Sequence, residues 1–125
     1  MRETLFAMVL TLGAMPALAQ TLDTDDFEVA TTSNLLDLCG APAAHPMSDE
    51  GLMFCFGYLG GVMDFHRVLV QVEGDGFDPI ACPNAPVSRA EMAQVFVDWA
   101  QANPQHMDEP AVDGLARAAV ARWPC

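Results

Sequence analysis

Residues 55–66 read CFGYLGGVMDFH, and this stretch decides the fold of the chain. Extended to residues 48–72, it predicts one long helix, because its apolar residues recur with helical spacing. One apolar stripe contains Leu52, Phe56, Leu59, Met63, His66 and Val70, and a second contains Phe54, Tyr58, Phe65 and Leu69. A helix that is apolar on two sides is usually the buried centre of a domain. We therefore expect this helix to be buried.

Three glycines, Gly57, Gly60 and Gly61, lie inside the same stretch. Each costs a helix about 1 kcal/mol relative to alanine, so their presence needs a physical reason. We expect the close approach of another backbone at this face. The alternative is a local break in the helix.

The start of the chain has the pattern of a secretory signal peptide, residues 1–19. Arg2 provides a positive charge, residues 5–15 form an apolar run, and Ala17-Leu18-Ala19 is a small-x-small cleavage site. We expect cleavage after Ala19 and export to the periplasm. The apolar run is too short and interrupted to span a bilayer, so no membrane span is expected in the mature form. A retained N-terminal anchor is the alternative.

Export favours disulfides, and all four cysteines, Cys39, Cys55, Cys82 and Cys125, follow the predicted cleavage site. Two helical hairpins would bring Cys39 to Cys55 and Cys82 to Cys125. We predict these two bonds. From the loss of chain entropy in the unfolded state, they should contribute about 3 and about 4 kcal/mol, respectively, to the free energy of unfolding. Zinc is the rival reading, but there is no Cys-x-x-Cys pair and the histidines are scattered, so no metal or other cofactor is expected. A free C-terminal thiol used for dimerisation is a further alternative.

Charge narrows the class of partner. Five basic residues against 17 acidic ones give a formal net charge of −12. Such a surface repels nucleic acid and anionic lipid and suits a basic protein partner. Solubility alone also explains many of these carboxylates.

The remaining segments predict an all-α, compact four-helix domain over residues 32–125. Residues 20–31 read as an acidic, extended and flexible arm. A short helix capped by Thr32 or Ser33 runs to Cys39, and Ser48 caps the long helix. Ser88 and Glu91 form a capping box for a third helix, which stops at Asn103-Pro104. Asp108 or Glu109 caps a last helix, whose expected buried stripe is Val112, Leu115, Ala116, Ala119 and Trp123.

No arrangement of residues in the sequence predicts catalysis, so we expect a binding protein and not an enzyme. There is no Gly-x-Ser-x-Gly nucleophile motif. We interpret His66, on an apolar stripe, as a hydrogen-bonded core histidine rather than a general base. Asp64 is expected to be partly buried, bonded to Arg67 or to a neighbouring helix end; a partner-binding role is the alternative.

The spacing of these features resembles a known family. The pattern is Cys39, then Cys55-x-Gly57-Tyr58-x-x-Gly-Val62-x-Asp64, then Cys82-Pro83, Trp99 ahead of Asn103-Pro104, and a terminal Trp123-Pro124-Cys125. Over residues 34–125 it resembles the Tai/Rap immunity proteins, which protect bacteria against type VI secretion amidase effectors. The resemblance implies an exported, all-helical, disulfide-bonded protein, often a homodimer, that blocks the active-site cleft of a peptidoglycan amidase. The resemblance applies to the scaffold and does not assign the residues that contact the partner, since the family's partner-contacting loops vary.

The candidate partner-binding surface is the acidic loop that contains Glu73, Asp75, Phe77 and Asp78. Wall enzymes are often basic, so an acidic loop would steer association, and Phe77 could anchor in a cleft. Two other functions are alternatives: a periplasmic acid-stress chaperone and a small subunit of an envelope complex. Protonation of the carboxylates at low pH supplies the reasoning for the chaperone.

Overall fold

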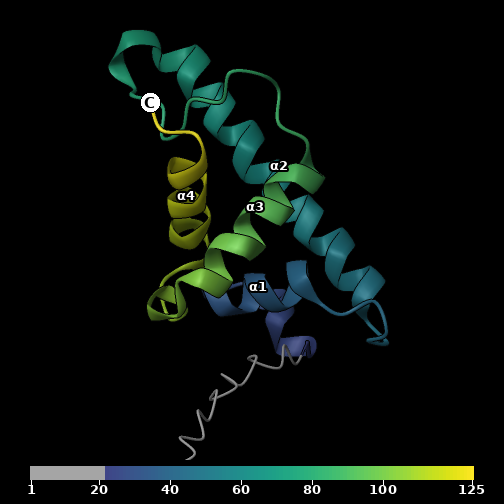
Figure 1. Cartoon of the computed structure of the whole chain (residues 1–125). Coiled ribbons are helices and arrows are strands. Elements are labelled where there is room, and N and C mark those ends of the chain that lie inside the picture. Colours follow the sequence, from purple (N-terminus) through teal and green to yellow (C-terminus); the bar gives the residue numbers. More distant parts are fainter. Residues whose placement is uncertain (1–21) are drawn as a thin grey trace, which may run out of the picture.

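The computed structural model describes residues 22–125, and its α-helices confirm the all-α prediction (Figure 1). The helices are α1 (Thr32–Gly40), α2 (Ser48–Glu73), α3 (Arg89–Ala102) and α4 (Ala111–Arg122), with short 3-10 turns η1 (Thr24–Glu28), η2 (Gly74–Gly76) and η3 (Pro104–His106). Within these residues the only β-type pairing is an isolated bridge between Thr31 and Pro110. The predicted signal peptide lies outside the described residues. None of the described helices is long and apolar enough to cross a membrane.

Helix α1 packs against each of the other three helices, and α3 packs against both α2 and α4. The largest fully buried side chains at these contacts are Phe96, Leu35, Leu38, Leu59, Thr32 and Cys55. Two disulfides, Cys39–Cys55 and Cys82–Cys125, confirm both predicted pairings. The first joins α1 to α2 inside the core, and the second joins the loop before α3 to the residue that ends the chain.

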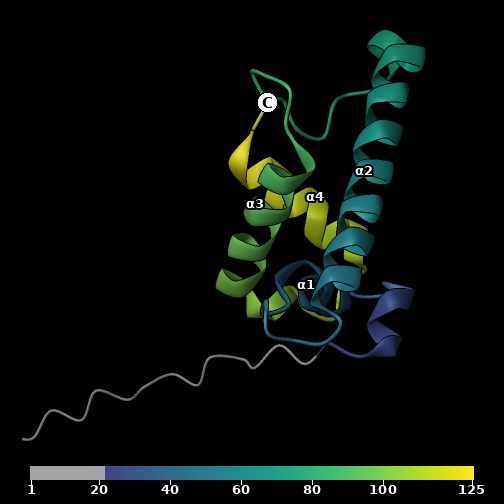
Figure 2. The same ribbon diagram turned by 90° about the vertical axis from the view of Figure 1, so that its right-hand side faces the viewer.

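The prediction that α2 is buried throughout is wrong. Its buried residues, Gly51, Cys55, Leu59 and Gly60, all lie in the N-terminal half. Towards the other end Phe65 is 65% and Val72 is 73% exposed. Length is the physical reason. At 1.5 Å per residue α2 extends about 39 Å, against about 21 Å for α3, so its C-terminal half extends beyond the helices that could cover it (Figure 2).

The glycines of α2 do not share one role. A Cβ on Gly60 would lie 2.6 Å from Nε of Arg89, so this glycine makes room for a side chain and not for a backbone. Gly57 and Gly61 have no neighbouring atom within 4 Å of a Cβ position. Close backbone approach occurs instead at Gly51, whose Cβ position is 3.3 Å from the carbonyl oxygen of Leu38. The helix is continuous, so the alternative of a local break is also wrong.

Helix ends fall close to their predicted positions, but the capping groups differ. Thr31, one residue earlier than predicted, caps α1 by accepting from the Asn34 amide. Ser88 caps α3 as predicted, accepting from the Glu91 amide at 3.1 Å. Helix α2 begins at Ser48 without a side-chain cap, because Met47 occupies the cap position.

Helix α4 also lacks the predicted acidic cap, because Pro110 occupies that position. Glu109 instead bonds the ring of His106 at 2.7 Å and accepts from Nε of Arg117 at 2.8 Å. The hydrogen bond with His106, together with Arg117, holds the pKa of Glu109 below its usual range. This carboxylate therefore ties η3 to the middle of α4.

Residues 22–31, the described part of the predicted extended arm, are structured, contrary to that prediction. They contain η1, and Leu22 and Asp26 are buried. The Asp26 carboxylate accepts from the backbone of Asp23 at 2.8 Å and from the Asn34 side chain at 2.9 Å. Composition indicated an acidic arm, but these hydrogen bonds and the burial of Leu22 hold the segment against α1.

Asp37 on α1 makes the contact between η1 and α1 depend on pH. Burial, followed by the charges of Asp26 and Asp23, raises the pKa of Asp37 from 3.8 to about 6. Because the folded state binds this proton more tightly than the unfolded state does, the raised pKa stabilises the fold at low pH. This contribution is fully present below about pH 4 and is lost as the pH rises through about 6. We expect Asp37→Asn to raise the free energy of unfolding by roughly 1–2 kcal/mol at pH 7.5, after allowance for solvent screening.

Urea unfolding of the oxidised protein at pH 7.5 and pH 3.5 tests this expectation. The gain should be present at the higher pH and absent at the lower one. The exposed Asp75, replaced by Asn, serves as the control with no gain at either pH. An equal effect of Asp37→Asn at both pH values would contradict the assignment.

Candidate functional site

The C-terminal end of α2 and η2 form an exposed acidic tip, defined here as residues 73–78 (Figure 2). Gly74 ends the helix with a φ of 53°, a value that favours glycine and turns the chain sharply. The side chains of Glu73, Asp75 and Asp78 are exposed. Within residues 22–125 none of these three forms an ion pair. The tip therefore presents three carboxylates with no cation to neutralise them.

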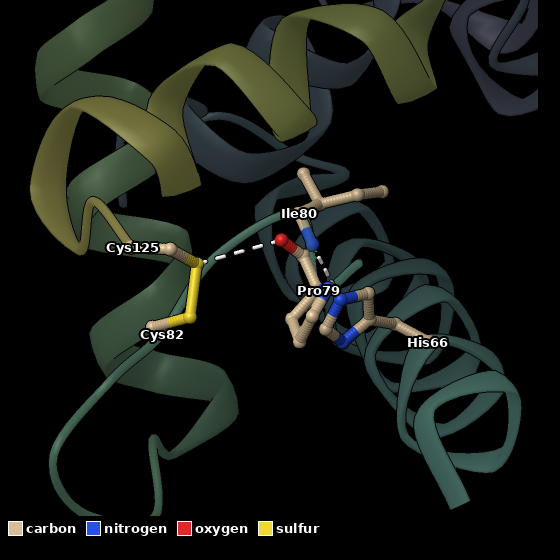
Figure 3. Close-up of a disulfide and its surroundings, with 5 residues drawn as sticks. All are labelled: His66, Pro79, Ile80, Cys82 and Cys125. Carbon is tan, nitrogen blue, oxygen red and sulfur yellow. Dashed lines mark hydrogen bonds between the residues drawn. A yellow bond between two sulfur atoms is a disulfide. The ribbon is translucent and has the colours of Figure 1, made fainter. Parts of the chain in front are cut away.

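Within the acidic tip, the side chain of Phe77 packs against α2. It is half-buried, with its ring edge-to-face against His66 at 5.9 Å. Nε2 of His66 accepts a hydrogen bond of 3.0 Å from the backbone N–H of Ile80 (Figure 3). The prediction of a core histidine is thus wrong in its burial and right in its hydrogen bond. His66 and Phe77 together hold the returning loop against α2.

The other end of the same loop is held by the C-terminus. The backbone N–H of Cys82 donates to the carbonyl oxygen of Trp123 at 2.9 Å, next to the Cys82–Cys125 disulfide. Sγ of Cys125 lies 3.4 Å from the carbonyl oxygen of Pro79 (Figure 3). A disulfide sulfur carries no proton, so this is a packing contact rather than a hydrogen bond. The loop that follows the acidic tip is thereby attached to α2 at one end and to the residues after α4 at the other.

Asp64 is exposed, whereas the sequence predicted partial burial. Its carboxylate accepts a 2.8 Å hydrogen bond from Arg67, three residues later on α2, as one of the predicted alternatives required. Exposed pairs of this kind contribute little to stability. The effect of this pair is local: the charges of Asp64 and Arg67 neutralise each other on the wall of a groove.

This groove has a volume of about 510 Å³ and lies between α2, the loop before α3, and α4. Its apolar lining includes Met63, Ile80, Pro86, Val87, Met92 and Val112. All five residues of the stripe predicted to be buried on the last helix also line it, and Val112 is 44% exposed. The stripe is apolar as predicted, but part of it faces open space because α2 and α4 do not pack closely against each other.

Arg89 is a candidate site residue that the sequence patterns did not indicate. It is the first residue of α3, lines the groove, and lies across Gly60 of α2. One signal was present in the sequence: a cation in the first turn of a helix is unfavourable next to the positive end of the helix dipole. A residue that breaks a local rule in this way often has a functional reason.

The fold and these surfaces define a class: a small, disulfide-linked, all-helical protein with a projecting acidic surface. The model of the family described as Rap1a immunity proteins matches residues 31–125. The chain therefore belongs to the Rap1a immunity protein family, as the resemblance predicted. Membership of this family makes the chain a type VI secretion immunity protein in general and implies that it binds a partner effector protein. Neither a curated protein nor a solved structure matches the chain.

Proposed function

We propose that this protein is exported to the periplasm and neutralises a peptidoglycan amidase effector by placing its acidic tip in the active-site cleft. The observation that carries the proposal is the tip itself, where Glu73, Asp75 and Asp78 are exposed beyond the body of the domain. Family membership supports the binding of an effector. The chemistry of the tip supports a basic partner with a concave site.

Electrostatics favours this surface in the encounter with such a partner. Exposed carboxylates that lack internal cations keep their full charge for a partner and raise the association rate. The chain as a whole has a net charge of −12, so the rest of the protein also attracts a basic partner. This attraction decreases as salt screens it. The anchoring of the loop by His66 and the second disulfide limits the entropy lost when the tip is bound.

Phe77 has a different part from the three carboxylates in this proposal. Its ring packs on His66, so it orients the loop and offers only its remaining surface to the partner. We therefore assign the direct contacts first to Glu73, Asp75 and Asp78. Phe77→Ala would weaken binding through the position of the loop.

The test uses the oxidised protein and a panel of wall amidases, first in a pull-down at low and moderate salt. The triple variant Glu73→Gln, Asp75→Asn, Asp78→Asn should lower the association rate with the captured amidase by about tenfold at low salt and weaken inhibition. A matched control, Glu28→Gln, Asp98→Asn, Asp108→Asn, removes the same charge from exposed positions away from the tip. Equal losses in the two variants would show that net charge and not the tip is recognised. Capture of no amidase would remove the proposed target.

The exposed side of α2 also supports the expected homodimer. The positions Phe54, Tyr58, Gly61, Phe65, Val68 and Val72 alternate in steps of four and three residues, which is the spacing of a coiled-coil seam. In the described part of the chain nothing packs on Gly61, so a second α2 could approach closely there. The mass of the protein in solution, compared with that of Phe65→Ser, tests this pairing.

A further inference from the structure

The groove between α2 and α4 has the composition of a ligand site. Its volume of about 510 Å³ is within the range of roughly 300–1,000 Å³ found for small-molecule pockets. Most of its walls are apolar side chains, including Met63, Ile80 and Val112. Such sites bind an apolar group and orient it with a few polar groups. The charged side chains in the lining therefore decide which ligands fit.

The charged side chains of the groove are not equivalent. Asp64 and Arg67 form an ion pair of 2.8 Å, so each is compensated by the other. Arg89 forms no ion pair with any residue in the range 22–125. The remaining polar group, His66, already uses Nε2 to accept from Ile80. Arg89 is thus the one charged group of the lining that is free to bind an anion.

The position of Arg89 indicates that its charge has a use at this point. It stands in the first turn of α3, where the helix dipole disfavours a cation. It also requires Gly60 on α2, because a Cβ there would meet Nε at 2.6 Å. The chain thus combines an unfavourable charge and a helix-weakening glycine to keep one guanidinium at the groove. Arginine is well suited to this task, since its planar fork binds carboxylates in a bidentate manner.

From this geometry we infer that the groove binds a small amphipathic carboxylate. An acyl chain lies between α2, the loop 80–87 and α4, and the carboxylate pairs with Arg89. The negative charge of the rest of the chain opposes such a ligand only weakly. Salt at physiological strength screens exposed charges beyond about 8 Å. The site is separate from the acidic tip, so effector binding is not needed for it.

Decanoate is the probe, and 1-decanol is the uncharged comparison of the same length, both titrated into the oxidised protein at 0.15 M salt by calorimetry. We expect saturable binding of decanoate, about tenfold tighter than that of decanol. Arg89→Gln should abolish this preference while decanol still binds. Arg117→Gln removes the same charge from a position that does not line the groove, and should keep the preference.

Two further variants separate binding from folding. Gly60→Ala keeps the arginine but displaces its guanidinium, so it should also remove the preference for decanoate. Val112→Glu places a carboxylate at an exposed position on the groove wall and should abolish decanoate binding without loss of the fold. Circular dichroism verifies the fold of each variant. Absence of saturable decanoate binding, equal binding of decanol, or an equal loss in Arg117→Gln would overturn the inference.

Discussion

Replacement of both Cys82 and Cys125 by serine is expected to lower the free energy of unfolding by about 4 kcal/mol. The bond closes a loop with a sequence separation of 43 residues, and its loss returns that conformational freedom to the unfolded chain. A loss of this size is a large part of the roughly 5–15 kcal/mol that stabilises most domains. Thermal and urea unfolding under non-reducing conditions measure it.

A local effect should accompany this global one. The disulfide holds residues 79–82 against the end of α4, next to the bond between His66 and Ile80. Hydrogen exchange at the amide of Ile80 should therefore accelerate by more than the change in global stability explains. A single serine at Cys125 leaves Cys82 free and should show the same local effect. If the double variant unfolds at the same urea concentration as the parent, the C-terminal bond does not stabilise the fold.

Gly114→Ala is the second substitution with a large expected effect. The new Cβ would lie 2.5 Å from Cγ2 of Thr32, which is fully buried between α1 and α4. Thr32 also donates its hydroxyl to the carbonyl oxygens of Glu109 and Pro110, at 3.1 and 3.2 Å. Displacement of Thr32 therefore disturbs both packing and a buried hydrogen-bonding group. We expect a loss of about 1–3 kcal/mol, which exceeds the helix-propensity gain of alanine.

The matched control for this substitution is Gly57→Ala. Gly57 lies inside α2 with no atom within 4 Å of its Cβ position, so only helix propensity changes. This variant should be more stable than the parent by about 0.5–1 kcal/mol. Urea unfolding of the two variants in parallel should give opposite signs. A gain in both would mean that α1 and α4 are not packed as closely as the structure shows.

The candidate site was partly accessible from the sequence. An acidic loop after the long helix can be recognised from composition, and Glu73, Asp75 and Asp78 are indeed exposed. The role of Phe77 in holding the loop could not be predicted from the sequence. Its contact with His66 joins a loop to a helix face eleven positions earlier in the chain. Arg89 was visible only as a residue beside a helix cap. Its place at the groove depends on Gly60, in another helix.

The sequence by itself determined the helices, their approximate ends and both disulfides. These features depend on local physics: apolar spacing, capping residues such as Ser88, and short hairpins that bring cysteines together. Only the tertiary structure decided which apolar stripe is covered. Half of α2 is exposed because its neighbours are shorter, and the stripe of α4 faces a groove because α2 does not pack closely on it. Periodicity identifies an apolar face, but relative helix length and crossing direction determine whether anything packs on it.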